Sequence, residues 1–153
     1  MSYVDKILQP DETIVHVTGL HWLVYLPALA FLALTAATVV LSNYVATNLA
    51  TMVLLVAAAL AFLTVIAWLR GFLRRYGTEL AVTNRRVVFK RGLLRRHTIE
   101  MNMSKVESVD VDQSITGRVF GYGTVTIRGT GGGIEPLHNI RDPLAFRNHV
   151  TAG

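Results

Sequence analysis

The sequence predicts a transmembrane α-helical hairpin followed by a small, mainly β domain that is capped by a carboxyl-terminal helix. Residues 22–69 contain no Asp, Glu, Lys or Arg, whereas apolar and polar residues alternate after residue 78. A charge at the centre of a bilayer costs several kcal/mol, and a spanning helix needs about 20 apolar residues. The uncharged stretch therefore predicts transmembrane helices at residues 22–41 and 49–69, joined by an external turn at residues 42–48.

The composition fits one small domain attached to these helices. The chain has 153 residues, of which 52% are hydrophobic and only 16% are charged. About 80 residues follow the second helix, which is enough for one small domain. Cysteine is absent, which excludes a disulfide framework and a thiolate metal site.

Positive charges predict the orientation of the hairpin. Arg70, Arg74 and Arg75 follow the second helix in a short basic linker, residues 70–77, and we expect them to act as a juxtamembrane anchor. The turn between the helices has no Lys or Arg, so the positive-inside rule places the turn outside and the carboxyl-terminal part in the cytoplasm. Two spans then place residues 1–21 in the cytoplasm as well.

The amino-terminal segment, residues 1–21, leaves two structures open. Val15 and Val17 alternate with His16 and Thr18, which is typical of a short strand but also of a segment at the bilayer surface. We expect it either to pack on the cytoplasmic domain or to lie along the membrane.

The domain at residues 78–153 has the pattern of short antiparallel strands. Glycines at 117, 121 and 123 predict a tight bend between strands, and residues 129–133 predict a hairpin connection. Asp142 is expected to cap a terminal helix that begins at Pro143. The pattern indicates a partly open barrel capped by this helix. Strands are expected at residues 79–82, 87–89, 97–101, 106–113, 124–128 and 134–137.

Motifs along the chain carry a resemblance to a known family. Two helices follow Leu8, Pro10 and Glu12, and the domain contains a further set of motif residues. Their order resembles the bacterial pleckstrin-homology-like (PH-like) domain of small membrane proteins. The resemblance implies a PH-like fold anchored in the bacterial inner membrane and says little about activity. The motif residues of the domain are Thr83, Asn84, Arg85, Arg86, Gly92, Lys105 to Glu107, Gln113, Arg118, Gly121, Gly123 and Gly129 to Gly132.

One basic, leucine-tipped turn is the candidate binding site for lipid or a partner. Leu93 and Leu94 are flanked by cations on both sides. On a domain tethered below a bilayer, the leucines would enter the acyl layer, and each cation would gain about 1 kcal/mol from anionic headgroups. The alternative is that the leucines pack into the end of the barrel beneath a solvated basic rim. The cations are Lys90, Arg91, Arg95 and Arg96, with Arg85 and Arg86 one strand earlier.

No motif in the sequence indicates catalysis, a cofactor or a metal site. The five histidines lack metal-ligand spacing, there is no Gly-x-Ser-x-Gly motif, and the glycine-rich turn lacks the Lys and Ser/Thr of a phosphate-binding loop. Residues 76–153 have eleven Lys and Arg against seven Asp and Glu, but no aromatic platform for nucleic acid accompanies this charge.

Two functions remain open from the sequence. The first is a non-catalytic membrane protein that presents a PH-like binding domain to anionic lipid or to a protein partner. The second is a small accessory or scaffold subunit whose hairpin docks on a larger membrane complex or on copies of itself. Alanines along both helices would allow such close packing.

Overall fold

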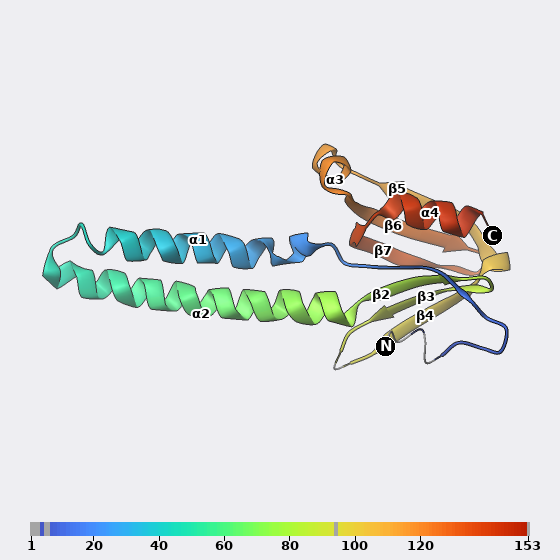
Figure 1. Ribbon diagram of the computed structural model, residues 1–153, viewed down its shortest axis with the longest axis horizontal. Coiled ribbons are helices and arrows are strands. Elements are labelled where there is room, and N and C mark those ends of the chain that lie inside the picture. The colour runs from blue at the N-terminus through green and yellow to red at the C-terminus, as the bar shows by residue number, and fades with distance from the viewer. Residues whose placement is uncertain (1–3, 5–6, 94, 153) are drawn as a thin grey trace. The chain divides into compact units, whose positions relative to one another are not determined.

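The computed structural model describes residue 4, residues 7–93 and residues 95–152 (Figure 1). The chain divides into two compact units. Trp22–Leu73 form a helical unit, whereas Met1–His21 and Arg74–Gly153 together form a sheet unit. The segments before and after the apolar helices therefore fold together into one compact unit.

The helical unit consists of two long apolar helices that run antiparallel (Figure 1). A 3-10 turn, η2 (Trp22–Tyr25), leads into α1 (Leu26–Leu41), and α2 covers Thr47–Gly77. By length and composition alone, Trp22–Leu41 and Leu49–Gly77 are long and apolar enough to cross a membrane.

Small residues allow close contact within the helical unit. Ala28 and Ala57 are buried. A Cβ added at Gly71 would come within 2.8 Å of the Tyr25 ring, so a larger residue would force the ring aside. The other alanines that we expected to mediate packing are exposed, namely Ala30, Ala33, Ala37, Ala58 and Ala61.

The basic segment at residues 70–77 is helical, so the prediction of a linker there was wrong. Arg70, Arg74 and Arg75 continue α2 without a break to Gly77. Arginine has a high helix propensity, so these charges limit the apolar stretch without ending the helix.

The sheet unit contains two antiparallel sheets and a terminal helix, which confirms the predicted two-sheet, helix-capped domain (Figure 1). The first sheet has the order β1-β2-β3-β4, and the second has the order β5-β6-β7. A bridge between Leu20 and Ile140 joins β1 to β7, so the two sheets meet along one side. The strands are β1 (Ile14–Gly19), β2 (Glu79–Thr83), β3 (Arg86–Arg91), β4 (His97–Asn102), β5 (Val106–Asp112), β6 (Tyr122–Gly129) and β7 (Gly132–Arg141).

Three helical elements follow α2 within the described part of the sheet unit. The short turn η3 (Met103–Lys105) connects the sheets, and α4 (Pro143–Thr151) ends the chain. The third element, α3 (Ile115–Phe120), lies where we predicted only a tight bend. Asp142 precedes α4 with a φ of 47°, and no capping hydrogen bond from its side chain is found in the described part of the chain.

The main core lies between the sheets and α4. Alternate residues of facing strands point inward, and Phe146 of α4 is fully buried against them. The β6–β7 hairpin turns at Gly129 and Gly132, as expected. The buried core residues are Leu80, Val82, Val87, Phe89, Val109, Val125, Ile127, Ile134, Leu137, Ile140, Phe146 and Val150.

A second, smaller core covers the opposite face of β2 and β3. Val4 packs with Ala81 and Val88, and Ile7, Leu8 and Ile14 surround them. The amino-terminal segment therefore contributes both the edge strand β1 and a cover for the sheet. Of the two structures left open for this segment, packing on the domain is the one observed.

Candidate functional site

The candidate site is the connection between β3 and β4, which we call the basic tip and define as residues 91–93 and 95–97. Gly92 has a φ of +92°, and a Cβ there would overlap the carbonyl oxygen of Arg95. Only glycine fits this turn without strain. The remaining predicted tip residue, Leu94, lies outside the described residues.

The basic tip exposes one apolar side chain beside three cations. Leu93 is 45% exposed, so it does not pack into the end of the barrel. Arg91, Arg95 and Arg96 are exposed. Together with Gly92 and His97 they line an open depression of about 530 Å³.

The positive charge of the basic tip is not neutralised by neighbouring carboxylates. Among residues 4, 7–93 and 95–152, no ion pair involves Arg91, Arg95 or Arg96. Uncompensated cations around a concave surface raise the local concentration of anions. The tip can therefore hold an anionic group through charge and hydrogen bonds.

The basic tip lies against the last turn of α2. A Cβ added at Gly77 would come within 3.1 Å of the Leu93 nitrogen and 3.2 Å of the Gly92 carbonyl carbon. Arg74 and Arg75, which we expected to act as an anchor, are exposed on the same final turns of α2. The structure therefore brings these predicted groups to one end of the sheet unit.

Arg85 and Arg86 do not share this surface. They stand at the start of β3, whereas the tip follows its end, and six residues of strand extend roughly 20 Å. Arg85 is exposed, Lys90 is half-buried within β3, and Arg86 is largely covered. Grouping all these cations in one site was therefore wrong for Arg85 and Arg86.

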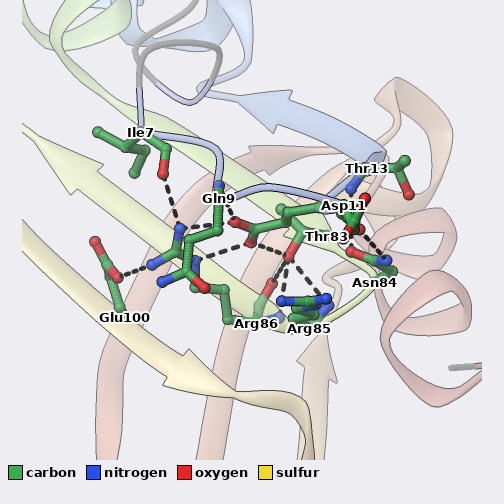
Figure 2. A network of polar contacts seen from close by, with 10 residues as sticks. Ile7, Gln9, Asp11, Thr13, Thr83, Asn84, Arg85, Arg86 and Glu100 are labelled. Atoms are coloured by element: carbon green, nitrogen blue, oxygen red, sulfur yellow. Dashed lines mark hydrogen bonds and ion pairs between the residues drawn. The ribbon is translucent and has the colours of Figure 1, made fainter.

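Arg86 instead forms the centre of a buried polar network (Figure 2). Its Nε and Nη2 donate to the two carboxylate oxygens of Glu12 at 2.9 and 2.8 Å. Nη1 donates to Glu100 at 2.6 Å, and Nη2 also donates to the carbonyl oxygen of Ile7 at 2.9 Å. Since such paired contacts fix both distance and orientation, Arg86 holds residues 7–12 on the sheet.

Thr83 and Asn84 complete the attachment of the amino-terminal segment. The Thr83 hydroxyl donates to Glu12 at 2.7 Å, and the Asn84 amide nitrogen donates to the Asp11 carbonyl at 3.2 Å. Asn84 Oδ1 accepts from the Thr13 nitrogen at 3.1 Å. The Thr83–Arg86 motif therefore binds residues 7–13 of the chain's own amino-terminal segment. The sequence did not predict this pairing, because 71 to 74 residues, including β1 and both apolar helices, separate Glu12 and Asp11 from their partners.

The network predicts a loss of stability in acid. Hydrogen bonding from Arg86 lowers the pKa of Glu12 from 4.5 to about 2. Because this pKa is lower in the folded state, ionised Glu12 stabilises the fold. The stabilisation is complete at pH values above the unfolded-state pKa of about 4.5, and it disappears as the pH falls toward 2. Scanning calorimetry of the full chain should show Glu12→Gln melting below the wild type above pH 4.5, with the gap closing near pH 2. A gap that is the same at every pH would contradict the assignment.

Two histidines stack between β1 and α4. The rings of His16 and His149 lie 4.5 Å apart and nearly parallel, and His149 Nδ1 lies 2.7 Å from the Ala145 carbonyl oxygen. Burial lowers the pKa of His16, and the nearby His149 lowers it further. The stacked rings therefore pack β1 against α4. In the part of the chain that the structure describes, no three His, Asp or Glu side chains gather as they would around a metal ion.

Comparison with known proteins gives a match to a protein family. The model of a family described as Bacterial PH domain matches residues 17–153. The matched range covers the end of β1, both apolar helices and the part of the sheet unit that follows them. No curated protein and no solved structure matches the chain.

Proposed function

The chain belongs to the bacterial PH domain family, and from this premise we propose that it is a non-catalytic binding module anchored in the bacterial inner membrane by its two apolar helices. The module binds anionic lipid headgroups through its basic tip. Both chain ends lie on the cytoplasmic side.

The exposure of the helices supports a membrane location. Only 6% of the most apolar window of each helix is buried. A core helix of a soluble protein would be mostly buried, whereas most side chains of these helices are exposed and need an apolar solvent. The proposed solvent is the bilayer.

The pairing of β1 with β2 supports an even number of crossings. β1 precedes the helices and β2 follows them, yet Thr18 pairs with Leu80 and Gly19 with Glu79. Strands that share a ladder must lie on the same side of a membrane. A chain that crosses twice satisfies this requirement, and Arg70, Arg74 and Arg75 favour the cytoplasm as that side.

The position of the basic tip is the observation that carries the lipid proposal. The tip lies against Gly77, eight residues beyond Leu69 in the same helix. An α-helix rises about 1.5 Å per residue, so the tip is about 12 Å along α2 from the end of the predicted span. The headgroup layer is about 5–7 Å thick, so the backbone of the tip would lie just outside it, with the headgroups within reach of the long side chains of its three arginines.

Lipid titration of the full chain tests this proposal. In a neutral detergent, native mass spectrometry should detect binding of short-chain phosphatidylglycerol, and binding should weaken as salt increases because charge drives it. Phosphatidylcholine is the matched neutral-charge control, and inorganic phosphate reports whether the headgroup anion alone suffices. Equal binding of the two lipids would contradict the proposal.

Purification of the full chain in a neutral detergent tests the alternative function, an accessory or scaffold subunit. The exposed alanines of α1 favour it, because small residues permit close helix packing. A protein that copurifies in fixed stoichiometry would support a scaffold or accessory role, and a stable homo-oligomer would support self-association.

Topology gives an independent expected result. A reporter inserted at Asn43 should be accessible from outside the cell, and a reporter fused after Gly153 should be accessible only from the cytoplasm. The reason is that the turn between the helices has no positive charge whereas α2 ends in arginines. The reverse pattern would overturn the proposed placement of the sheet unit.

A further inference from the structure

The short helix α3 exposes an unusual amount of apolar surface for its length. Ile115 is 83% exposed, Val119 is 74% exposed and Phe120 is 55% exposed. We call these three side chains the α3 knob. Exposed apolar residues are ordinary when scattered, but Ile115 and Val119 lie four residues apart on one helix face and Phe120 directly follows Val119, so the three are clustered.

The backbone beneath the knob is firmly held. Ser114 Oγ accepts from the Gly117 nitrogen at 3.1 Å, and Gly121 ends the helix with a φ of 72°. Behind the helix, Gln113 Nε2 donates to the Tyr122 carbonyl at 3.0 Å, and the Asp142 nitrogen donates to the Gly121 carbonyl at 2.9 Å. The structure therefore presents the knob outward from a fixed base.

The knob lies where the chain passes into its first apolar helix. The His21 side chain is hydrogen-bonded to the backbone of Phe120, and the centroids of the His21 and Tyr122 rings lie 5.4 Å apart. His21 is bonded directly to Trp22, the first residue of the first candidate span. The basic tip contacts Gly77, the end of the second helix. The α3 knob and the basic tip, with its exposed Leu93, thus lie at the points of the sheet unit to which the helices are joined.

We propose that the α3 knob inserts into the interfacial layer of the membrane that holds the helices, as a second contact beside the basic tip. This inference rests on the proposed function, since it needs the helices to span a bilayer. Arg118 lies within α3 and is exposed, and the carboxylate beside Gly121, that of Asp142, is paired with Arg141 at 3.9 Å, so the surface around the knob carries an excess of cations. That combination suits an anionic bilayer surface.

Single cysteines can measure the depth of each feature, because the chain has no cysteine of its own. The full chain, reconstituted in nanodiscs of phosphatidylglycerol and phosphatidylcholine, is labelled with an environment-sensitive fluorophore at one site at a time. Val119→Cys reports on the knob, and Leu54→Cys reports on an exposed position within the predicted span of α2. Thr130→Cys is the matched control, because it is exposed at the opposite end of β6 from α3.

The expected result is that lipids carrying a spin label quench the Leu54 and Val119 fluorophores but not the Thr130 fluorophore, and that Val119 emission shifts to the blue. Protection of β6 and β7 amides from hydrogen exchange verifies that each variant is folded. If Leu54 is quenched while Val119 behaves like Thr130, the inference about the knob is overturned and the membrane anchor stands. If Leu54 is not quenched, the proposed anchor fails and the inference fails with it. A blue shift at Val119 without lipid quenching would mean that protein covers the knob, which also overturns the inference.

Discussion

Replacement of Arg86 by alanine is expected to destabilise the sheet unit by about 3–5 kcal/mol, the usual cost of removing one partner from a buried ion pair. The Glu12 side chain is fully buried, and Arg86 supplies two of its hydrogen bonds. Alanine would leave this carboxylate without its cation. It would also release the Ile7 carbonyl and so loosen the cover over Ala81 and Val88.

Hydrogen exchange is the suitable measurement, because it reports on the sheets separately from the helices. At 1.36 kcal/mol per factor of ten, exchange of the β2 and β3 amides should accelerate by roughly 10²-fold to 10³-fold or more. Arg85→Ala is the matched control, since Arg85 is the adjacent residue and is exposed. Its effect should stay within about 0.5 kcal/mol, as for most surface substitutions. Similar exchange in both variants would show that the Arg86 network contributes little to stability.

Loss of charge at the basic tip is expected to have the largest effect on lipid binding. Each Lys or Arg near an anionic surface contributes about 1 kcal/mol, so replacing Arg91, Arg95 and Arg96 together with glutamine should remove about 3 kcal/mol. The affinity for phosphatidylglycerol should then fall roughly 100-fold. Because these side chains are exposed, the fold should be retained.

A second triple variant separates position from net charge. Arg85, Arg128 and Arg147 are also exposed and lie outside the tip, and changing them to glutamine removes the same charge. If the tip is the binding site, this control should lose far less affinity. Equal losses would indicate that total charge, rather than the tip, determines binding.

Most strands of the sheet unit could be predicted from local pattern, because alternation directly reflects which face is buried. Val125 and Ile127 in β6 are fully buried, as their spacing indicated. Helix α3 could not be predicted in this way. Gly117 appeared to mark a bend, but glycine is needed there because a Cβ would come within 2.6 Å of the Tyr122 carbonyl oxygen. That constraint comes from a tertiary contact and leaves no periodic signal.

The candidate site was predictable only where it is local in sequence. The tip is one turn, so its leucine and arginines could be recognised together. The partner of Arg86 could not, because Glu12 lies on the other side of both helices in the sequence and the pairing depends on the completed fold. Proximity in sequence also placed Arg85 and Arg86 in the wrong group, since β3 carries the chain away from them before the tip begins.

The division of the sheet unit between two distant segments determines the order in which the protein can be completed. During translation, residues 14–19 leave the ribosome early but must wait for residues 79–83, which follow both apolar helices, before they can pair. Synthesis of both helices therefore precedes closure of the first sheet. For the same reason, a fragment that starts at residue 78 would lack β1, Glu12 and the cover over Ala81, and would expose an unpaired β2 edge prone to aggregation. An expression fragment of this domain needs residues 4–21 joined to residues 74–152 by a linker that replaces the helices.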